Sequence, residues 1–114
     1  EGMVHATKAG IDPEQMLQII LSSRAKSGII EMKAPQILKR DFTPFFPLSL
    51  MAKDMRLVSE SAEALGVQLP FASALQEIFA RCAASGLGGE DFAAIVKPLE
   101  QQAQIEVKPR TSVG

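Results

Sequence analysis

The sequence contains no tryptophan and no tyrosine, and it has only one cysteine and one histidine. A single cysteine, Cys82, cannot form a disulfide within the chain, and it excludes a zinc site built from several cysteines. His5 has no second histidine with which to share a metal ion and no companion at the spacing of a catalytic triad. We therefore predict no metal site and a surface or ordinarily hydrogen-bonded role for His5.

An excess of positive or negative charge is also missing. The chain carries 12 Lys and Arg residues against 13 Asp and Glu residues, for a formal net charge of -1. This balance, without a basic block, excludes electrostatic attraction to nucleic acid or to an anionic membrane surface. We predict that the chain binds neither.

Long apolar runs and alternating patterns are missing too. The longest apolar run lies around residues 16–21 and is too short to span a bilayer, and no charged-then-apolar signal segment opens the sequence. No stretch sustains the period of two that is typical of a half-buried strand. These absences predict a cytoplasmic location and an all-α fold.

What the sequence does contain is a long helical pattern between Pro47 and Gly66. Pro47 cannot extend a helix backwards, and Gly66 suits a left-handed helix ending. Apolar residues recur between them at spacings of three and four, and a second apolar row lies beside the first: Leu48, Met51, Met55, Val58, Ala62 and Leu65, then Leu50, Leu57 and Ala64. A helix with so wide an apolar surface is predicted to be central and to be buried on more than one side.

The remaining pattern predicts a single domain of about six helices over residues 1–103, followed by a flexible tail over residues 104–114. Asp12 stands directly before a proline, and this pair predicts a helix start. Pro35 is expected to begin a separate short helix, and Pro98 is expected to kink or break the last helix.

Three local features allow either a chemical or a structural interpretation. Residues 86–89, GLGG, superficially match a phosphate-binding loop, but a helix rather than a strand is predicted before them, so a helix-capping turn is favoured. Residues 22–28, SSRAKSG, suit an anion site or a solvated loop, and the loop is favoured. Cys82 falls on the apolar face of its helix, where a cysteine is usually an inert hydrophobic residue.

Lys53 is harder to interpret. The polar face of the long helix carries its cations toward the N-terminus and its acids toward the C-terminus, an order that opposes the helix dipole. Lys53 is either a solvated lysine beside Asp54 or a residue that is kept for another purpose. The pattern alone leaves both interpretations open.

Several motifs occur in an order that resembles a known family. They are AGIDPE from Ala9, LKRDFTP from Leu38, PFFPLSLMAKDMRLV from Pro44, ALGVQLP from Ala64 and SGLGGEDFAAIVKPLE from Ser85. Their order and spacing resemble the C-terminal domain of the β-hydroxyacid dehydrogenase family, which includes 3-hydroxyisobutyrate dehydrogenase, tartronate semialdehyde reductase and glyoxylate/succinic semialdehyde reductase. The resemblance implies an all-helical domain like the C-terminal domain of 6-phosphogluconate dehydrogenase. It also implies a preceding Rossmann domain that binds NAD or NADP, and an interdomain helix that carries the catalytic lysine.

The resemblance further implies roles for individual residues. Lys53 matches the lysine of the family's Lys-Asp pair and is thereby expected to bind both cofactor and substrate. Phe46 matches an aromatic residue that helps to wall the nicotinamide end of the cofactor. Lys8 lies next to the Ala-Gly turn and does not match the catalytic lysine, so no catalytic residue is expected in this chain.

The implied function is that of the C-terminal domain of an NAD(P)-dependent β-hydroxyacid dehydrogenase or reductase, which contributes to the substrate cleft and the dimer interface. The expected partners are its own Rossmann domain, further copies in a homodimer or higher homo-oligomer, and a small hydroxy acid or semialdehyde substrate. The chain alone is expected to be inactive and to hold no cofactor. The alternative is a free-standing helical module for protein interaction or oligomerisation.

Overall fold

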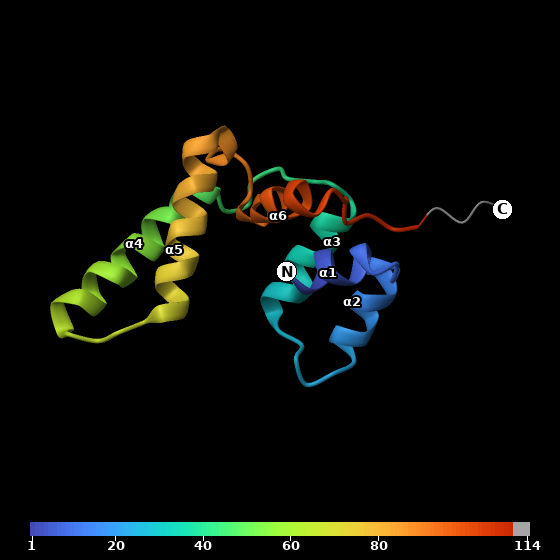
Figure 1. The fold of residues 1–114 in the computed structure, drawn as a ribbon, viewed down its shortest axis with the longest axis horizontal. Coiled ribbons are helices and arrows are strands. Elements are labelled where there is room, and N and C mark those ends of the chain that lie inside the picture. The colour runs from blue at the N-terminus through green and yellow to red at the C-terminus, as the bar shows by residue number, and fades with distance from the viewer. Residues whose placement is uncertain (111–114) are drawn as a thin grey trace. The chain divides into compact units, whose positions relative to one another are not determined.

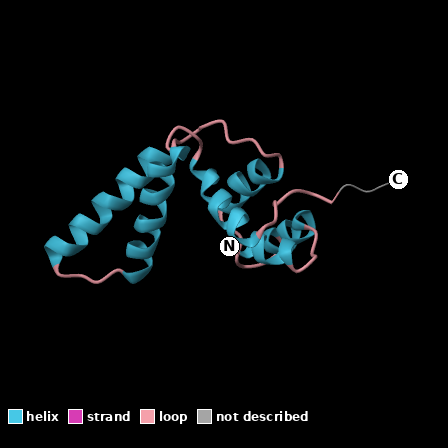
Figure 2. Ribbon diagram, turned by 45° about the horizontal axis from the view of Figure 1, so that its top comes forward, coloured by secondary structure: helices cyan, strands magenta, loops and turns pink. Residues whose placement is uncertain are grey.

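The structure is a computed structural model that describes residues 1–110. Within this range it contains helices and loops but no strand, so the predicted all-α fold is confirmed (Figures 1 and 2). The helices are α1 (Gly2–Lys8), α2 (Pro13–Leu21), α3 (Gly28–Leu38), α4 (Leu48–Leu65), α5 (Pro70–Cys82) and α6 (Val96–Ala103), with a π-helical turn, η1 (Ala83–Leu87), and a 3-10 helix, η2 (Phe92–Ile95), between α5 and α6. None of these helices is long and apolar enough to cross a membrane.

The chain forms two compact units. The terminal unit comprises residues 1–42 together with the chain from Val96 onward, and the middle unit comprises Thr43–Ile95. The core of the terminal unit consists of buried apolar side chains from both of its chain segments: Val4, Leu17, Ala34, Leu38, Val96 and Val107.

Local sequence signals determine the end of α1 and the start of α2, and the start at Asp12 is the predicted one. Gly10 follows α1 with a φ of +91°, a conformation that favours glycine because a side chain would be strained there. Asp12 caps α2, since its carboxylate accepts a hydrogen bond from the backbone N–H of Glu14 at 2.9 Å. Leu17 then points into the core of the terminal unit.

The prediction that Pro35 begins a separate helix is wrong. α3 runs without interruption through Pro35, and it begins at Ser27, whose hydroxyl accepts a hydrogen bond from the N–H of Ile30 at 3.1 Å. Proline lacks the N–H that a helix interior normally uses, which favours a break. Ala34 and Leu38 are buried in the core on either side of Pro35, and we attribute the unbroken helix to this packing.

The break in the last predicted helix lies earlier than Pro98. The chain changes from η2 to α6 between Ile95 and Val96, so Pro98 falls in the first turn of α6. Proline is tolerated there because the first N–H groups of a helix have no intrahelical partner. The expected interruption therefore exists, but it lies between Ile95 and Val96 rather than at Pro98.

Beyond α6 the chain stays packed against the terminal unit for several residues. Val107 is fully buried, and its N–H donates to a carboxylate oxygen of Glu100 at 2.7 Å. The guanidinium of Arg110 donates to the carbonyl oxygen of Gly10. The last part of the predicted tail, residues 111–114, lies outside the described residues.

A buried ion pair holds this segment in place. Arg40 donates two hydrogen bonds to the carboxylate of Glu100, at 2.5 and 2.9 Å, and the Glu100 side chain is only 5% exposed. The hydrogen bond and the negative charge of Glu100 raise the pKa of Arg40, against the smaller opposing effect of burial. Glu100 thereby joins the end of α3 to the chain that follows α6.

In the middle unit, α4 packs along α5 (Figure 1). α4 begins directly after Pro47 and ends at Gly66, which has a φ of +71°, so both predicted ends are confirmed. Its burial differs from the prediction, because only Leu48 and Ala62 are buried. The expected burial of α4 on more than one side is therefore wrong within this chain, and the exposed apolar residues include Leu50, Leu57, Val58 and Leu65.

Candidate functional site

The start of α4 is held by a buried carboxylate. The Oδ1 atom of Asp91 accepts hydrogen bonds from the N–H groups of Phe45 and Phe46 at 3.1 and 3.2 Å, and Oδ2 accepts one from the N–H of Ala93 at 2.9 Å. Asp91 is fully buried. Sequence analysis did not single out Asp91, because its contact with Phe45 and Phe46 joins residues far apart in the chain.

Backbone hydrogen bonds complete this junction. The N-cap of α4 is Pro47, whose side chain accepts no hydrogen bond, so the first N–H groups of the helix need other acceptors. The N–H of Leu48 donates to the carbonyl of Glu90 at 2.8 Å, and the N–H of Ser49 donates to the carbonyl of Gly88 at 3.0 Å. The segment before η2 therefore caps α4.

Phe46 has a fixed orientation in this junction. Its ring meets the ring of Phe92 edge to face, with centroids 6.1 Å apart and planes at 81°. The carbonyl of Phe46 accepts a hydrogen bond from the N–H of Phe92 at 3.0 Å. Phe46 is partly buried, whereas the neighbouring Phe45 is 79% exposed. The structure thus presents one oriented and one exposed aromatic ring beside the start of α4.

Lys53 lies further along α4 with an accessible side chain. Its side chain is 49% exposed, and Nζ lies 3.7 Å from Oδ1 of Asp54, which is a solvated ion pair of little energetic weight. An ammonium group has three N–H donors, so this partner leaves Lys53 able to bind an anionic or polar ligand. Lys53 and Phe46 have different partners, Asp54 and Phe92. Phe46 belongs to the junction before α4, and Lys53 stands in the first half of that helix.

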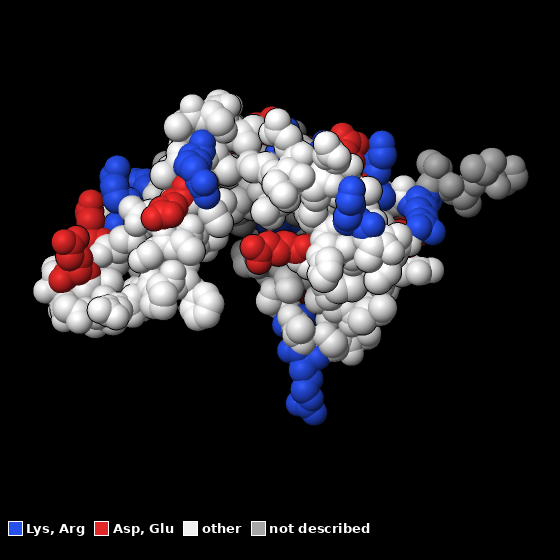
Figure 3. All heavy atoms as spheres, in the orientation of Figure 1, with Lys and Arg blue, Asp and Glu red and all other residues white. Residues whose placement is uncertain are grey.

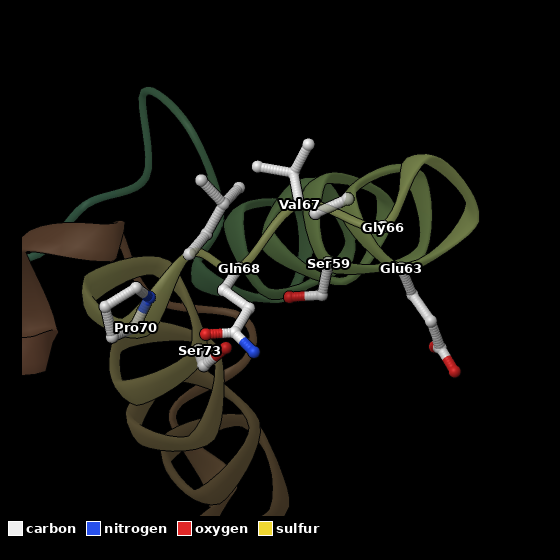
Figure 4. Close-up of a pocket in the computed structure, with 9 residues that line it drawn as sticks. Ser59, Glu63, Gly66, Val67, Gln68, Pro70 and Ser73 are labelled. Carbon is white, nitrogen blue, oxygen red and sulfur yellow. The ribbon is translucent and has the colours of Figure 1, made fainter.

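A separate hollow lies toward the other end of α4. It has a volume of about 650 Å³ and is lined by the end of α4, the connection through residues 66–69, and the start of α5. Ser59, Gln68 and Ser73 face the space between the helices, while Glu63 points away (Figure 4). The Ser59 hydroxyl is buried there without a hydrogen-bond partner. No sequence signal pointed to this hollow, and neither Lys53 nor Phe46 lines it.

The glycine-rich and serine-rich segments have structural roles. Residues 86–89 follow α5 and begin inside the π-helical turn η1, where Gly86 has a φ of +95°, so the interpretation as a helix-capping turn is confirmed. In residues 22–28, the Ser22 and Ser23 hydroxyls donate to carbonyls of α2 at 3.0 and 2.7 Å, and Ser27 caps α3. These serines are exposed, as expected of a solvated loop.

Cys82 and His5 also fit their structural interpretations. Cys82 is 2% exposed, and burial raises the pKa of its thiol, which the nearby charge of Arg81 opposes only in part. His5 lies exposed on α1. Within residues 1–110, no three His, Cys, Asp or Glu side chains gather in a way that could hold a metal ion.

The described residues do not contain every element that normally holds a dinucleotide. A dinucleotide is normally held by a strand, a glycine-rich turn and a helix, and residues 1–110 contain no strand. On the face shown in Figure 3, the charged side chains of both signs are scattered among uncharged ones. Of the two residues singled out from the sequence, Lys53 offers an accessible ammonium and Phe46 an oriented aromatic ring.

Comparison with known proteins gives one consistent result. The family described as "NAD-binding of NADP-dependent 3-hydroxyisobutyrate dehydrogenase" matches residues 1–99. The chain is 39% identical over 103 residues to 2-hydroxy-3-oxopropionate reductase of Escherichia coli, a match that covers 90% of this chain and 35% of that protein. It is 30% identical to the chloroplastic glyoxylate/succinic semialdehyde reductase 2 of Arabidopsis thaliana, over 88% of this chain and 28% of that protein.

Solved structures agree with this result. The fold matches a 3-hydroxyisobutyrate dehydrogenase from Salmonella typhimurium with a TM-score of 0.83 and 31% identity, over 86% of this chain and 34% of that one. It also matches the 3-hydroxyisobutyrate dehydrogenase of Mycobacterium tuberculosis with a TM-score of 0.80 and 26% identity, over 87% of this chain and 36% of that one. The chain spans about a third of the length of these relatives. The resemblance found in the sequence is thus confirmed, and the chain belongs to the NAD-binding family of NADP-dependent 3-hydroxyisobutyrate dehydrogenase.

Proposed function

We propose that the chain is the C-terminal domain of an NAD(P)-dependent β-hydroxyacid dehydrogenase or reductase. The whole enzyme would interconvert a hydroxy acid and a semialdehyde or keto acid. The observation that carries this proposal is the family match over residues 1–99, and it is supported by relatives that are named as dehydrogenases and reductases. This support favours the enzyme over a free-standing interaction module.

In this proposal the chain works together with its own N-terminal Rossmann domain. That domain would bind NAD or NADP, and the bound nicotinamide would supply the hydride chemistry. We assign no catalytic residue to this chain. Its own contribution is to line the substrate cleft and to take part in a homodimer or higher homo-oligomer. Its cytoplasmic location stays a prediction.

We assign the substrate contact to Lys53. The proposed substrates are small acids, and a lysine ammonium binds a carboxylate as a compact charge with three donors. The Lys53 side chain is half-exposed, and within residues 1–110 its ion-pair partner is the solvated Asp54, so a ligand carboxylate or a cofactor ribose oxygen can compete for its ammonium. Binding by Lys53 would orient the acid without a direct role in bond breaking.

Phe46 is assigned to the nicotinamide end of the same cleft. An aromatic wall excludes water and packs against a flat ring, provided that its own orientation is fixed. The edge-to-face contact with Phe92 and the Asp91 hydrogen bond to its N–H supply that fixation. Lys53 shares this rigid support, because it stands on the helix that begins at the same junction.

The test is an assay of the full-length protein for NAD(P)H oxidation. Glyoxylate, succinic semialdehyde and tartronate semialdehyde would serve as acceptors, and 3-hydroxyisobutyrate would serve in the oxidative direction. We expect turnover with at least one of these compounds and one of the two cofactors, and none from the 114-residue chain alone. The proposal is abandoned if the full-length protein binds neither NADH nor NADPH in calorimetric titration and turns over none of the four test compounds.

A further inference from the structure

Ser49 carries a hydroxyl group that the proposed function does not use. It stands in the first turn of α4, and its side chain is exposed. Among the described residues, this hydroxyl has no hydrogen-bond partner. A serine hydroxyl donates one hydrogen bond and can accept others, so Ser49 is able to bind a polar atom of a ligand. Its neighbours decide which ligand atom that is.

Ser49 shares one face of α4 with Lys53. Residues four apart in an α-helix are neighbours on its surface, with Cβ atoms roughly 5–6 Å apart. Helical side chains are directed toward the N-terminus of their helix, so Lys53 is directed toward the turn that carries Ser49. Because the lysine stem is long and flexible, its ammonium can reach a ligand that also contacts the Ser49 hydroxyl.

The junction before α4 fixes Ser49 and keeps space beside it. The N–H of Ser49 donates to the carbonyl of Gly88 at 3.0 Å, which holds the backbone in place. Gly88 has a φ of -60°, a value that any residue can adopt, so the backbone conformation does not require a glycine there. A Cβ added at Gly88 would lie 3.5 Å from the Cβ of Ser49. The missing side chain therefore leaves this flank of Ser49 uncovered.

Phe46, Ser49 and Lys53 follow one another in an order that matches the proposed cleft. Phe46 contacts Phe92, and Ser49 contacts Gly88, so both adjoin the segment that caps α4. In the proposed function, Phe46 lines the nicotinamide end and Lys53 binds the substrate carboxylate. Ser49 lies between these two residues in the chain. It is thus placed for a group between the reacting carbon and the carboxylate of the substrate.

We propose that Ser49 is a specificity-determining residue that hydrogen-bonds to a hydroxyl group on C2 of a β-hydroxy acid. In such an acid, C2 is the single carbon between the reacting C3 and the carboxylate. The inference rests on the proposed function, because that function assigns the two ends of the cleft. It adds the preferred substrate class, which is a 2,3-dihydroxy acid and the 2-hydroxy-3-oxo acid formed from it.

The reaction leaves the C2 hydroxyl unchanged. In the oxidative direction, C3 gives a hydride to NAD(P)+, and the C3 hydroxyl gives its proton to a base outside this chain. The products are the 2-hydroxy-3-oxo acid and NAD(P)H. Ser49 therefore contributes to binding and orientation, and it takes no part in bond breaking.

A hydroxyl and a methyl group at C2 have similar size but different chemistry. A C2 methyl group would displace water from Ser49 without replacing its hydrogen bond, whereas a C2 hydroxyl replaces it. Sites that hydrogen-bond a substrate hydroxyl discriminate against analogues that lack it. Because Ser49 is exposed, we expect discrimination of about ten-fold, the size of one ordinary hydrogen bond.

The test compares two nearly isosteric substrates of the full-length protein. Racemic glycerate carries a hydroxyl group at C2, and racemic 3-hydroxyisobutyrate carries a methyl group there. The ratio of their kcat/KM values should favour glycerate in the wild type. Ser49→Ala should lower this ratio about ten-fold by reducing kcat/KM for glycerate. Ser49→Thr keeps a hydroxyl group and should retain most of the preference.

Ser61→Ala is the matched control, because Ser61 is another exposed serine farther along α4. It should leave the ratio unchanged. The inference is overturned if the wild type prefers 3-hydroxyisobutyrate or oxidises neither acid. It is also overturned if Ser49→Ala keeps the ratio or lowers kcat/KM equally for both acids, since an equal loss indicates a structural role. Calorimetric titration with NADH and NADPH separates these results from failure of the proposed function, which would abolish cofactor binding as well.

Discussion

The buried carboxylate of Asp91 accepts a hydrogen bond from the backbone N–H of Phe46 at 3.2 Å, although 44 residues lie between Phe46 and Asp91 in the sequence. The same carboxylate also accepts the N–H groups of Phe45 and Ala93. Phe46 has no freedom to reorient while these bonds persist, because its ring is also held by Phe92. The Asp91 side chain thus helps to position the start of α4, together with the carbonyls of Gly88 and Glu90 that cap the helix.

Replacing Asp91 should therefore destabilise the chain. Asp91→Ala removes the buried carboxylate that accepts from the N–H groups of Phe45, Phe46 and Ala93, and we expect the free energy of unfolding to fall by about 3 kcal/mol. Asp91→Asn keeps an oxygen for Phe45 and Phe46 but offers an NH2 group toward the N–H of Ala93, so its effect should be smaller, roughly 1–2 kcal/mol. Urea unfolding measures both, and equal stability of Asp91→Ala and wild type would contradict the assigned role.

Lys53→Met should separate ligand binding from folding. The variant keeps most of the aliphatic stem of a half-exposed side chain, so the free energy of unfolding should change by less than about 0.5 kcal/mol. In the full-length enzyme, kcat/KM should fall about ten-fold or more, since a charge-assisted hydrogen bond to the substrate or cofactor is lost.

Arg56→Met is the control for this variant. Arg56 stands on the polar surface of the same helix, and among the described residues it is paired only with Glu60, at 3.6 Å, so its loss should change kcat/KM little. Wild-type kcat/KM in Lys53→Met, or an unfolded Lys53→Met protein, would rule out the binding role of Lys53.

The ion pair between Arg40 and Glu100 should matter more than any exposed pair. Glu100→Ala leaves the partly buried Arg40 and the N–H of Val107 without their acceptor, and we expect a loss of about 3–5 kcal/mol. Glu31→Ala removes the exposed partner of Lys26 at 3.8 Å and should cost less than about 0.5 kcal/mol. Comparable urea midpoints for the two variants would contradict this ranking.

The pKa of Arg40 also predicts how this pair responds to pH. A raised pKa in the folded state means that its stabilising contribution is fully present below the ordinary pKa of arginine and is lost only as the pH rises through the folded value. Titration of Arg40 should therefore cause no change in stability between pH 6 and about pH 10. Urea unfolding of wild type and Arg40→Met across that range should give a constant difference in free energy.

Cys82 should react slowly with thiol reagents. Its burial and raised pKa both reduce the amount of accessible thiolate at pH 8. We expect modification by iodoacetamide to be at least ten-fold slower in the folded chain than in the chain unfolded by urea. Equal rates would show that the thiol is accessible in the native state.

Local chemistry in the sequence predicted most helix ends correctly. Asp12, Pro47 and Gly66 determine their ends through capping, missing donors or a left-handed backbone, and these effects act within a few residues. Pro35 behaved differently because core packing on both sides outweighed its local preference. Contacts across the chain, which no local pattern records, decided that case.

The candidate site shows the same division. Lys53 and Phe46 were singled out through the resemblance of their motifs, whereas the residues that hold the start of α4 were not. The contact of Asp91 with Phe45 and Phe46 joins two loops, and periodicity carries no information about such contacts. The burial of α4 was overestimated because an apolar face can be reserved for a surface outside the middle unit, and its sequence pattern is the same in both cases.

The division into two units has a consequence for the order of synthesis. The middle unit lies within the sequence of the terminal unit, whose core requires Val96 and Val107 as well as Val4 and Leu17. A ribosome therefore releases all of Thr43–Ile95 before the terminal unit has its complete set of core residues. Residues 1–42 therefore have to wait for Val96 and Val107, so a nascent chain arrested before α6 should expose Leu17 and its neighbours to chaperones.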